Sequence, residues 1–226
     1  MKKYELTTNV KTVFGRKLFQ IKALISFGCI EAGELGGWIE DEKNLSQSGD
    51  AWVSGNAEVS GDARVYGDAR VYGNAEVSGD AEVYGDARVY GDAEVYGDAE
   101  VYGDARVYGD AWVSGNARVY GDARVYGNAE VYGDARVSGN AEVSGDADHL
   151  VIGPIGSRKG HTTFYRRNDG VTMVVCGCFH DTIDAFEEQV VLTHGVNEHA
   201  KAYQAAVQFV KAVINTDPVE EVPSDE

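Results

Sequence analysis

The stretch VYGDAEVYGDAEVYGDARVYGD, residues 89–110, repeats one six-residue phrase, G-[DN]-A-x-V-[YS], which runs from Gly49 to Gly145 without a slip. Ala, x and Val alternate with the period of two that is typical of a strand, and Gly followed by Asp or Asn is a turn signal. A strand of three residues buries nothing alone, but stacked copies place Val on Val and Ala on Ala in an interior column. A slip of one residue would turn every Val outward. The repeat therefore predicts a β-solenoid.

The charges at the outward x position indicate how many phrases make one coil. Three phrases give a coil of about 18 residues with three faces, and only this arrangement sorts the charges by face. The first face, named here the Arg face, carries Trp52, Arg70, Arg88, Arg106, Arg124 and Glu142. The second, the acidic face, carries Glu58, Glu76, Glu94, Trp112, Glu130 and Asp148. The third, the mixed face, carries Arg64, Glu82, Glu100, Arg118 and Arg136.

The sorted charges suggest contact between copies of the chain. Like charges one strand spacing apart, about 4.8 Å, repel one another, and docking the Arg face of one chain on the acidic face of another would relieve both ladders. Such a heterologous contact closes into a ring, most simply a homotrimer. The expected interface residues are Arg70, Arg88, Arg106 and Arg124 on one side and Glu58, Glu76, Glu94 and Glu130 on the other. The alternative is a solvated charged surface with stacked tyrosines that shield the strands.

The net charge of the 226-residue chain is −17, and most of it belongs to the repeat. An acidic solenoid is unsuited to direct binding of a nucleic-acid backbone. The negative charge is explained either by solubility or, alternatively, by mimicry of DNA. The three cysteines form no paired framework, which suits a reducing compartment. No apolar segment resembles a signal peptide or a membrane span, so we expect a cytoplasmic protein without membrane contact.

The phrase V-Y-G-D-A-R fits the pattern of hexapeptide-repeat, left-handed β-helix proteins over residues 48–148. The preceding EAGELGGWIEDEKNLSQSGDAWV, residues 31–53, resembles the entry segment of a narrower group, the YdcK-like hexapeptide proteins of bacteria and phages. The resemblance implies a left-handed parallel β-helix. Members of the group are described as transferases or as polymer-forming proteins, so the resemblance says little about activity.

The chain departs from the acyltransferases of the hexapeptide family. Those enzymes use a histidine as a general base at the groove between subunits, and they build acceptor sites from loops inserted in the coils. Here all five histidines lie outside the coils, and no insertion interrupts the repeat; they are His149, His161, His180, His194 and His199. We therefore expect a protein that is not an enzyme and needs no cofactor.

The two ends differ from the repeat. Residues 1–47 read as a β cap in which Trp38 and Ile39 cover the open edge of the first coil. Residues 149–216 predict a small α+β domain of three strands and two helices, with Asp181 or Thr182 as an N-cap and Gly195 as a C-cap. Residues 217–226 read as a disordered acidic tail.

Specific chemistry is expected where repetition stops. The segment GPIGSRKGHTTFYRR, residues 153–167, is basic and rich in glycine within an acidic protein, which suits a phosphate or carboxylate ligand. A solvated hairpin loop is the alternative. The expected ligand-binding residues are Gly156, Ser157, Arg158, Lys159, His161, Thr162 and Arg166.

Cys176, Cys178 and His180 alternate in a segment that reads as one strand, where all three side chains would face the same way. Such a set could hold zinc, although a fourth ligand is missing unless His161 comes near. Buried core cysteines are the commoner case, so no metal is assigned.

These observations favour a scaffold in which a trimerising β-helix presents a C-terminal binding domain. Its partner would be a host protein or a small anionic molecule, with phage counter-defence as the setting that the resemblance suggests. An acyl or other group transferase and an acidic DNA mimic are the alternatives.

Overall fold

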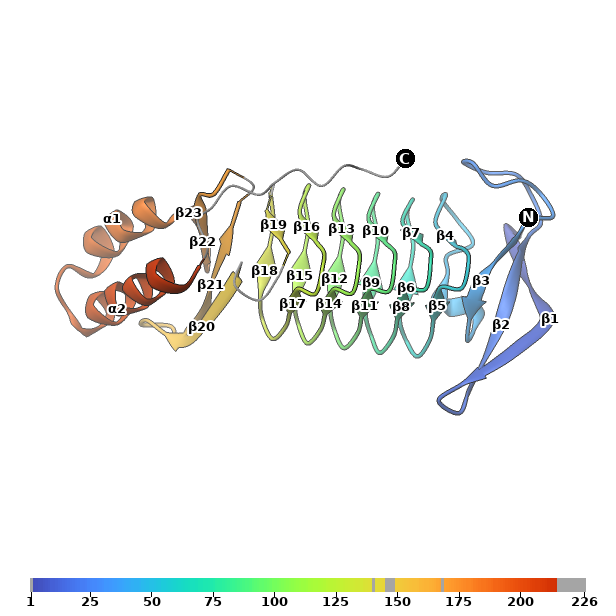
Figure 1. Ribbon diagram of the computed structural model, residues 1–226, viewed down its shortest axis with the longest axis horizontal. Helices are drawn as coiled ribbons and strands as arrows, with labels where there is room; N and C mark the ends of the chain where they lie inside the picture. The colour runs from blue at the N-terminus through green and yellow to red at the C-terminus, as the bar shows by residue number, and fades with distance from the viewer. Residues whose placement is uncertain (1, 140, 145–148, 168, 215–226) are drawn as a thin grey trace.

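The computed structural model describes residues 2–139, 141–144, 149–167 and 169–214. Figure 1 shows an elongated molecule in which a column of coils stands between two end structures. The column is a parallel β-solenoid of about six coils, with equivalent strands roughly 18 residues apart. These findings confirm the mostly β architecture and the coil length expected from the sequence. Asp148 and the acidic tail at residues 217–226 lie outside the described residues.

Three sheets form the faces of the solenoid, and each follows one of the three predicted rows of side chains. The Arg face contains β4 (Trp52–Val53), β7 (Arg70–Val71), β10 (Arg88–Val89), β13 (Arg106–Val107), β16 (Arg124–Val125) and β19 (Glu142–Val143). The mixed face contains β6 (Arg64–Val65), β9 (Glu82–Val83), β12 (Glu100–Val101), β15 (Arg118–Val119) and β18 (Arg136–Val137). The acidic face contains β5 (Glu58–Val59), β8 (Glu76–Val77), β11 (Glu94–Val95), β14 (Trp112–Val113) and β17 (Glu130–Val131).

Alanine and valine fill the interior of the coils. Val95 pairs with Val113 in register, and both side chains are fully buried, as is Ala93. Backbone hydrogen bonds join consecutive coils, so that the Arg88 N–H donates to the Ala105 carbonyl over 2.9 Å. The corners require glycine: Gly91 has φ +75°, and a Cβ there would lie 2.9 Å from the backbone nitrogen of the next corner glycine.

Two ladders of stacked tyrosines run along the outside of the coils. Their ring centroids are 4.8–5.1 Å apart and their planes are almost parallel. One ladder follows the Arg face and contains Tyr72, Tyr90, Tyr108 and Tyr126. The other follows the mixed face and contains Tyr66, Tyr84, Tyr102 and Tyr120. Partial burial raises the pKa of several of these hydroxyls, and it brings that of Tyr84 and of Tyr108 to about 12.

The N-terminal cap extends one face of the solenoid. Strands β1 (Tyr4–Val13) and β2 (Arg16–Ala23) form an antiparallel hairpin, and β2 pairs with β3 (Leu35–Ile39). Strand β3 in turn pairs parallel with β5, which places the buried Ile39 beside Val59. Trp38 stands beside Glu58 in the same register, with Lys11 Nζ 4.6 Å from its ring centroid. The parallel strand pairing of the solenoid therefore begins at β3, before the first hexapeptide phrase.

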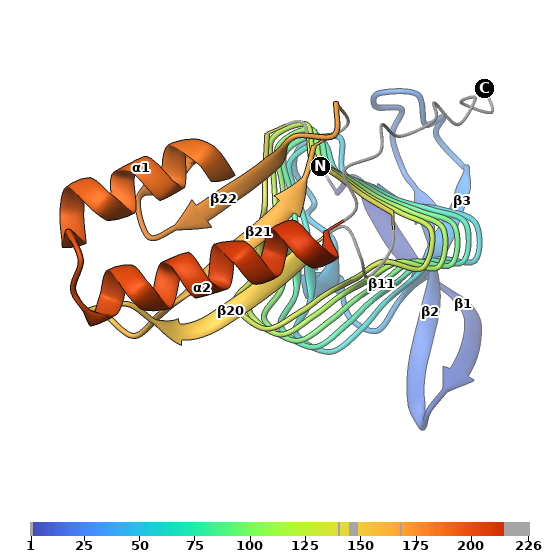
Figure 2. The ribbon, with the colours of Figure 1, turned by 60° about the vertical axis from the view of Figure 1, so that its left-hand side comes forward.

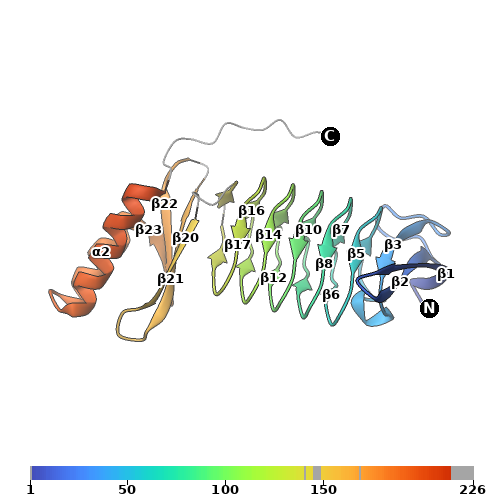
Figure 3. The ribbon, with the colours of Figure 1, turned by 60° about the horizontal axis from the view of Figure 1, so that its bottom comes forward.

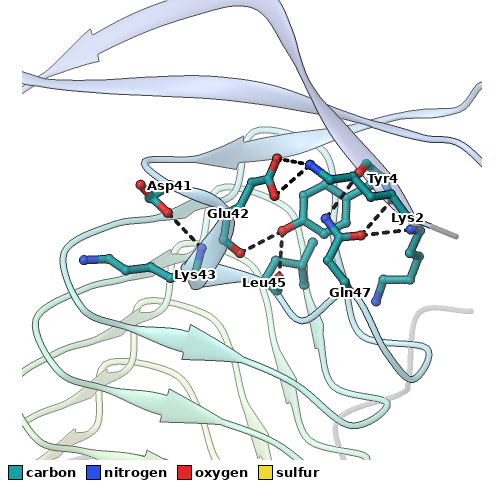
Figure 4. A network of polar contacts seen from close by, with 8 residues as sticks. Lys2, Tyr4, Asp41, Glu42, Lys43, Leu45 and Gln47 are labelled. Atoms are coloured by element: carbon teal, nitrogen blue, oxygen red, sulfur yellow. Dashed lines mark hydrogen bonds and ion pairs between the residues drawn. The ribbon is translucent and has the colours of Figure 1, made fainter.

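A polar latch ties the first strand to the short 3₁₀ helix Glu42–Asn44 (Figure 4). The Tyr4 hydroxyl contacts the carbonyl oxygens of Glu42 and Leu45 over 3.0 and 2.7 Å. The Gln47 side chain accepts from the backbone nitrogens of Lys3 and Tyr4. Because these partners are distant in sequence, the latch holds the start of the chain against the first coil.

A four-stranded antiparallel sheet covers the other end of the column (Figures 2 and 3). Its strands are β20 (His149–Ile155), β21 (Gly160–Arg166), β22 (Thr172–Cys176) and β23 (Phe179–Thr182). One side of the sheet packs on the coils through Tyr165 and Val175, and the other side packs on the helices through Phe164 and Val174. The Tyr165 hydroxyl donates to the Ser138 carbonyl over 3.1 Å. The C-terminal sheet is therefore a second cap.

The two predicted helices are present as α1 (Ile183–His194) and α2 (Glu198–Val213). Thr182 is the N-cap of α1 and Gly195 its C-cap, as expected. The prediction of three strands was wrong, because the segment expected as one strand from Val171 turns back at Gly177 and Cys178 and forms β22 and β23.

Candidate functional site

A cleft with a volume of about 510 Å³ lies where the C-terminal sheet meets the mixed face of the last coils. The coils supply Asp134 and Arg136, and the rest of the lining comes from the β20–β21 hairpin, the β22–β23 turn and the two helices. These parts contribute Ser157, Arg158, His161, Thr163, Cys176, Cys178, His194 and Tyr203. The volume lies within the usual range for small-molecule sites, roughly 300–1,000 Å³.

The structure brings three of the predicted ligand-binding residues together in this cleft: Ser157, Arg158 and His161. Gly156 lies next to the Tyr203 hydroxyl, and a Cβ at Gly156 would lie within 2.0 Å of that oxygen. Thr162 is buried below the cleft, where its hydroxyl donates to Cys176 Sγ over 3.2 Å.

Two further predicted residues do not line the cleft. Lys159 is exposed at the hairpin turn with φ +49°. Arg166 is 5 % exposed and lies at the far end of β21. Of the predicted residues of this segment, Ser157, Arg158 and His161 therefore line the cleft.

The charged side chains of the cleft include two arginines that are not matched by a carboxylate of the described residues. His161 Nδ1 lies 3.0 Å from Asp134 Oδ2 and so links the hairpin to the coils. Among the residues that the structure describes, Arg136 and Arg158 form no ion pair, and both are exposed. Two guanidinium groups without a carboxylate partner suit a ligand that carries a carboxylate or phosphate group.

A chain of polar contacts closes the floor of the cleft. Cys176 Sγ lies between the Thr162 hydroxyl and the Tyr203 hydroxyl, 3.6 Å from the latter. Burial, and then the contact with Cys176, raise the pKa of Tyr203 to about 12. Tyr203 therefore keeps its proton at physiological pH and can donate a hydrogen bond to a ligand.

The interpretation of Cys176, Cys178 and His180 as one row of side chains was wrong. Cys176 ends β22, Cys178 lies in the turn and His180 belongs to β23. Cys176 contacts Tyr203 on the helix side of the sheet, whereas His180 Nε2 lies 2.7 Å from the Tyr165 hydroxyl on the coil side. The sheet separates the two side chains. Over the described ranges, no group of three or more His, Cys, Asp or Glu side chains could hold a metal ion.

The expected interface residues follow the faces assigned to them, but some already have partners in their own chain. Arg70 donates to Cys29 Sγ over 2.7 Å, Glu58 pairs with Lys11, and Arg124 pairs with Glu142. Within the described part of the chain, Arg88 and Arg106 form no ion pair, and both are exposed. The middle of the Arg face thus carries two available guanidinium groups.

The acidic face carries aromatic side chains among its carboxylates. Trp112 is 42 % exposed and Tyr132, farther along the face, is 60 % exposed. Tyr96 stands edge-on to Trp112, with ring centroids 6.3 Å apart. Partial burial, followed by the neighbouring Glu58 and Glu94, raises the pKa of Glu76. A cation placed against this face would relieve that repulsion.

Reasoning from the sequence missed the contribution of the coils to the cleft. Asp134 and Arg136 occupy ordinary repeat positions of one phrase, residues 133–138, which ends with Ser138 where the preceding phrases of the mixed face end with tyrosine. Their place beside the hairpin follows from the way the C-terminal sheet sits on the end of the column. Two signals were available: the tyrosine row of the mixed face stops at Ser138, and a solenoid needs a cap at both ends.

The family model of the YdcK Beta solenoid repeat matches the chain five times, at residues 57–72, 63–79, 99–115, 111–127 and 117–133. All five matches lie within the coils, and together with the observed solenoid they are consistent with a YdcK-like repeat protein. No curated protein sequence matches the chain. In the described part of the chain, neither helix is long and apolar enough to cross a membrane.

Proposed function

We propose that this β-solenoid, built of YdcK-type repeats, is a non-enzymatic scaffold that docks the Arg face of one copy on the acidic face of the next. A heterologous contact of this kind closes most simply into a homotrimer. Each chain then presents one C-terminal cleft, so that the assembly offers three clefts to a small anionic ligand. Three linked sites raise the overall avidity for a multivalent partner without any new contact.

The observation that carries the proposal is the pairing of complementary faces on one column. Arg88 and Arg106 have no carboxylate partner among the described residues, while Glu76 and Glu94 repel each other on a different face. Both rows repeat with the same coil, since Arg88 pairs with Arg106 and Glu76 pairs with Glu94 in parallel register. The spacing of Arg88 and Arg106 on one chain therefore matches the spacing of Glu76 and Glu94 on the next.

Charge and aromatic side chains contribute differently to such an interface. An exposed ion pair adds only about 0–1 kcal/mol, so the charges chiefly determine orientation and partner. Trp112 is the type of residue that supplies most of the binding energy at interfaces. On the docked acidic face it would lie against the arginines and tyrosines of the neighbouring Arg face, where cation–π contact is favourable.

Charge reversal tests the docking. The double variant Arg88→Glu/Arg106→Glu should be a monomer, because two acidic faces then meet. Native mass spectrometry and light scattering measure the change. The matched control is Arg64→Glu/Arg118→Glu, which changes the net charge equally on the mixed face and should leave the trimer intact.

Rescue makes this test specific. Adding Glu76→Arg and Glu94→Arg to the double variant exchanges the signs of both faces within one chain, and the trimer should return. A double variant that stays trimeric, or a wild-type chain that is monomeric at high concentration, would contradict the docking.

The cleft makes a separate prediction. Protein purified gently from cells should carry extra mass of a few hundred daltons per chain in native mass spectrometry. Arg136→Gln/Arg158→Gln should lose that mass, because both free guanidinium groups of the cleft are removed. Lys201→Gln, an exposed cation on α2, is the control and should keep it. Retention of the mass by the double variant would exclude the cleft as its site.

A further inference from the structure

A groove with a volume of about 420 Å³ lies at the N-terminal end of the Arg face, and it shares no lining residue with the C-terminal cleft. The loop between β2 and β3 lines one side through Cys29 and Ile30. The first coils line the other side through Trp52, Arg70, Tyr72 and Arg88. The docking proposed above shares Arg88 and the Arg-face side chains Arg70 and Tyr72 with this groove, but it gives no role to Cys29, Ile30 or Trp52.

The loop holds the groove in a defined shape. Cys29 Sγ accepts a hydrogen bond from Arg70 Nη1 over 2.7 Å. Gly28, with φ +50°, lets the loop approach closely, since a Cβ there would lie 3.3 Å from Arg70 Nη2. Arg70 is thereby half-buried and positioned, whereas Arg88 at the open end of the groove has no ion-pair partner in the described part of the chain.

Trp52 supplies an independent indication of a ligand. Its side chain is 2 % exposed and packs against Tyr4 and Phe27. Its indole Nε1 has no hydrogen-bond partner among the described residues. A buried donor that is left without a partner destabilises the folded state. Nearby buried polar groups of the cap are satisfied, including Lys3 Nζ and the Tyr4 hydroxyl.

We propose that this groove binds a small molecule with one carboxylate or phosphate group and a planar apolar body. The guanidinium groups of Arg70 and Arg88 receive the anion, because their forked donors match such oxygens. The Trp52 indole N–H donates to the same molecule. The planar body lies against Ile30 and the Tyr72 ring, which form the apolar part of the lining. Glu34 at the groove accepts a hydrogen bond from any hydroxyl or amine on that body.

The indole N–H resonances provide the test, because the chain contains three tryptophans, two of which lie elsewhere. Trp38→Phe and Trp112→Phe assign the three signals in ¹⁵N-labelled protein. Titration with phenyl phosphate and with benzoate should shift the Trp52 signal saturably and leave the Trp38 and Trp112 signals unchanged. The more strongly bound of the two probes identifies the anion. Phenol should produce no saturable shift, and inorganic phosphate should bind at least tenfold more weakly.

Arg70→Gln should weaken the binding of the better probe at least tenfold, and Arg106→Gln, two coils farther along the Arg face, should leave it unchanged. Three outcomes would overturn the proposal: no saturable shift of the Trp52 signal, equal binding by Arg70→Gln, or equal binding of phenol and the anionic probes. A Trp52 signal that moves with protein concentration alone would assign the groove to contact between copies, and would also overturn it. Failure here leaves the docking proposal standing, because that proposal is tested by oligomeric state.

Discussion

Deletion of one residue from the middle of the solenoid, Asp98, is expected to unfold the coils that follow it, whereas deletion of eighteen, residues 91–108, should leave a folded protein. The corner at Gly97 and Asp98 joins two strands that are already tied to the next coil. Glu94 N and Glu100 N donate to Ala111 and Ala117 over 2.9 Å each. Loss of one residue removes about 3.3–3.6 Å of chain, and a slip would turn valines outward instead.

We expect the single deletion to lower the free energy of unfolding by at least about 4–5 kcal/mol, an exceptionally large loss, because it disrupts both the buried columns and the hydrogen bonds between coils. Deletion of residues 91–108 removes one coil and joins Tyr90, the last residue of one phrase, to Gly109, the first residue of another, so that the register is kept. Urea denaturation followed by circular dichroism measures both variants. Equal stability of the two would contradict the register argument.

Deletion of one phrase, residues 91–96, is the matched control for assembly. It preserves the interior columns but moves every later phrase to another face, so that Arg118 and Arg136 join the acidic face and Trp112 joins the Arg face. The variant should fold and remain monomeric, while the variant that lacks a whole coil should still assemble. Assembly by both would show that the sorted faces are irrelevant to it.

The second large effect is expected at alkaline pH. Burial raises the pKa of ladder tyrosines in the folded protein, to about 12 for Tyr84 and Tyr108, and Glu100 adds to the effect at Tyr84. Tyrosine side chains in the unfolded chain ionise near pH 10. The contribution of these tyrosines to the free energy of unfolding is therefore complete below about pH 10. It is lost as the pH rises to 12, because the tyrosines of the unfolded chain release their protons at a lower pH than those of the folded chain.

We therefore expect the solenoid to lose stability steeply between about pH 10 and 12, with unfolding and tyrosinate absorbance appearing together. Tyr84→Phe/Tyr108→Phe should reduce the slope of unfolding free energy against pH by about two protons. Trp112→Phe, which removes an aromatic side chain without an ionisable group, should keep the slope. Tyrosine ionisation near pH 10 with unchanged circular dichroism would contradict this prediction.

The repeat itself was predictable from the sequence because each of its interactions lies within one phrase or between identical phrases. Ala93, Val95 and Gly91 specify an interior pair and a corner, and the period of the outward charges at Glu76, Glu94 and Arg88 specifies the coil. The helices of the C-terminal domain were predictable for a similar reason, since Thr182 and Gly195 act within one or two turns of α1.

The sites depended on contacts that no local pattern records. Arg136 becomes part of a cleft only because the C-terminal sheet packs its Tyr165 side on the last coils. Cys176 and His180 were separated by a turn at Gly177 that places them on opposite sides of that sheet. The groove at Trp52 exists because a loop from the cap reaches Arg70 through Cys29.

The sequence by itself thus determined the solenoid, its coil of about 18 residues and the composition of its three faces, because a periodic chain repeats its local interactions at every step. Only the tertiary structure decided which repeat residues meet the two caps. Arg70 and Arg88 differ from Arg106 solely in what lies over them, and that is determined by packing between segments that are distant in the chain.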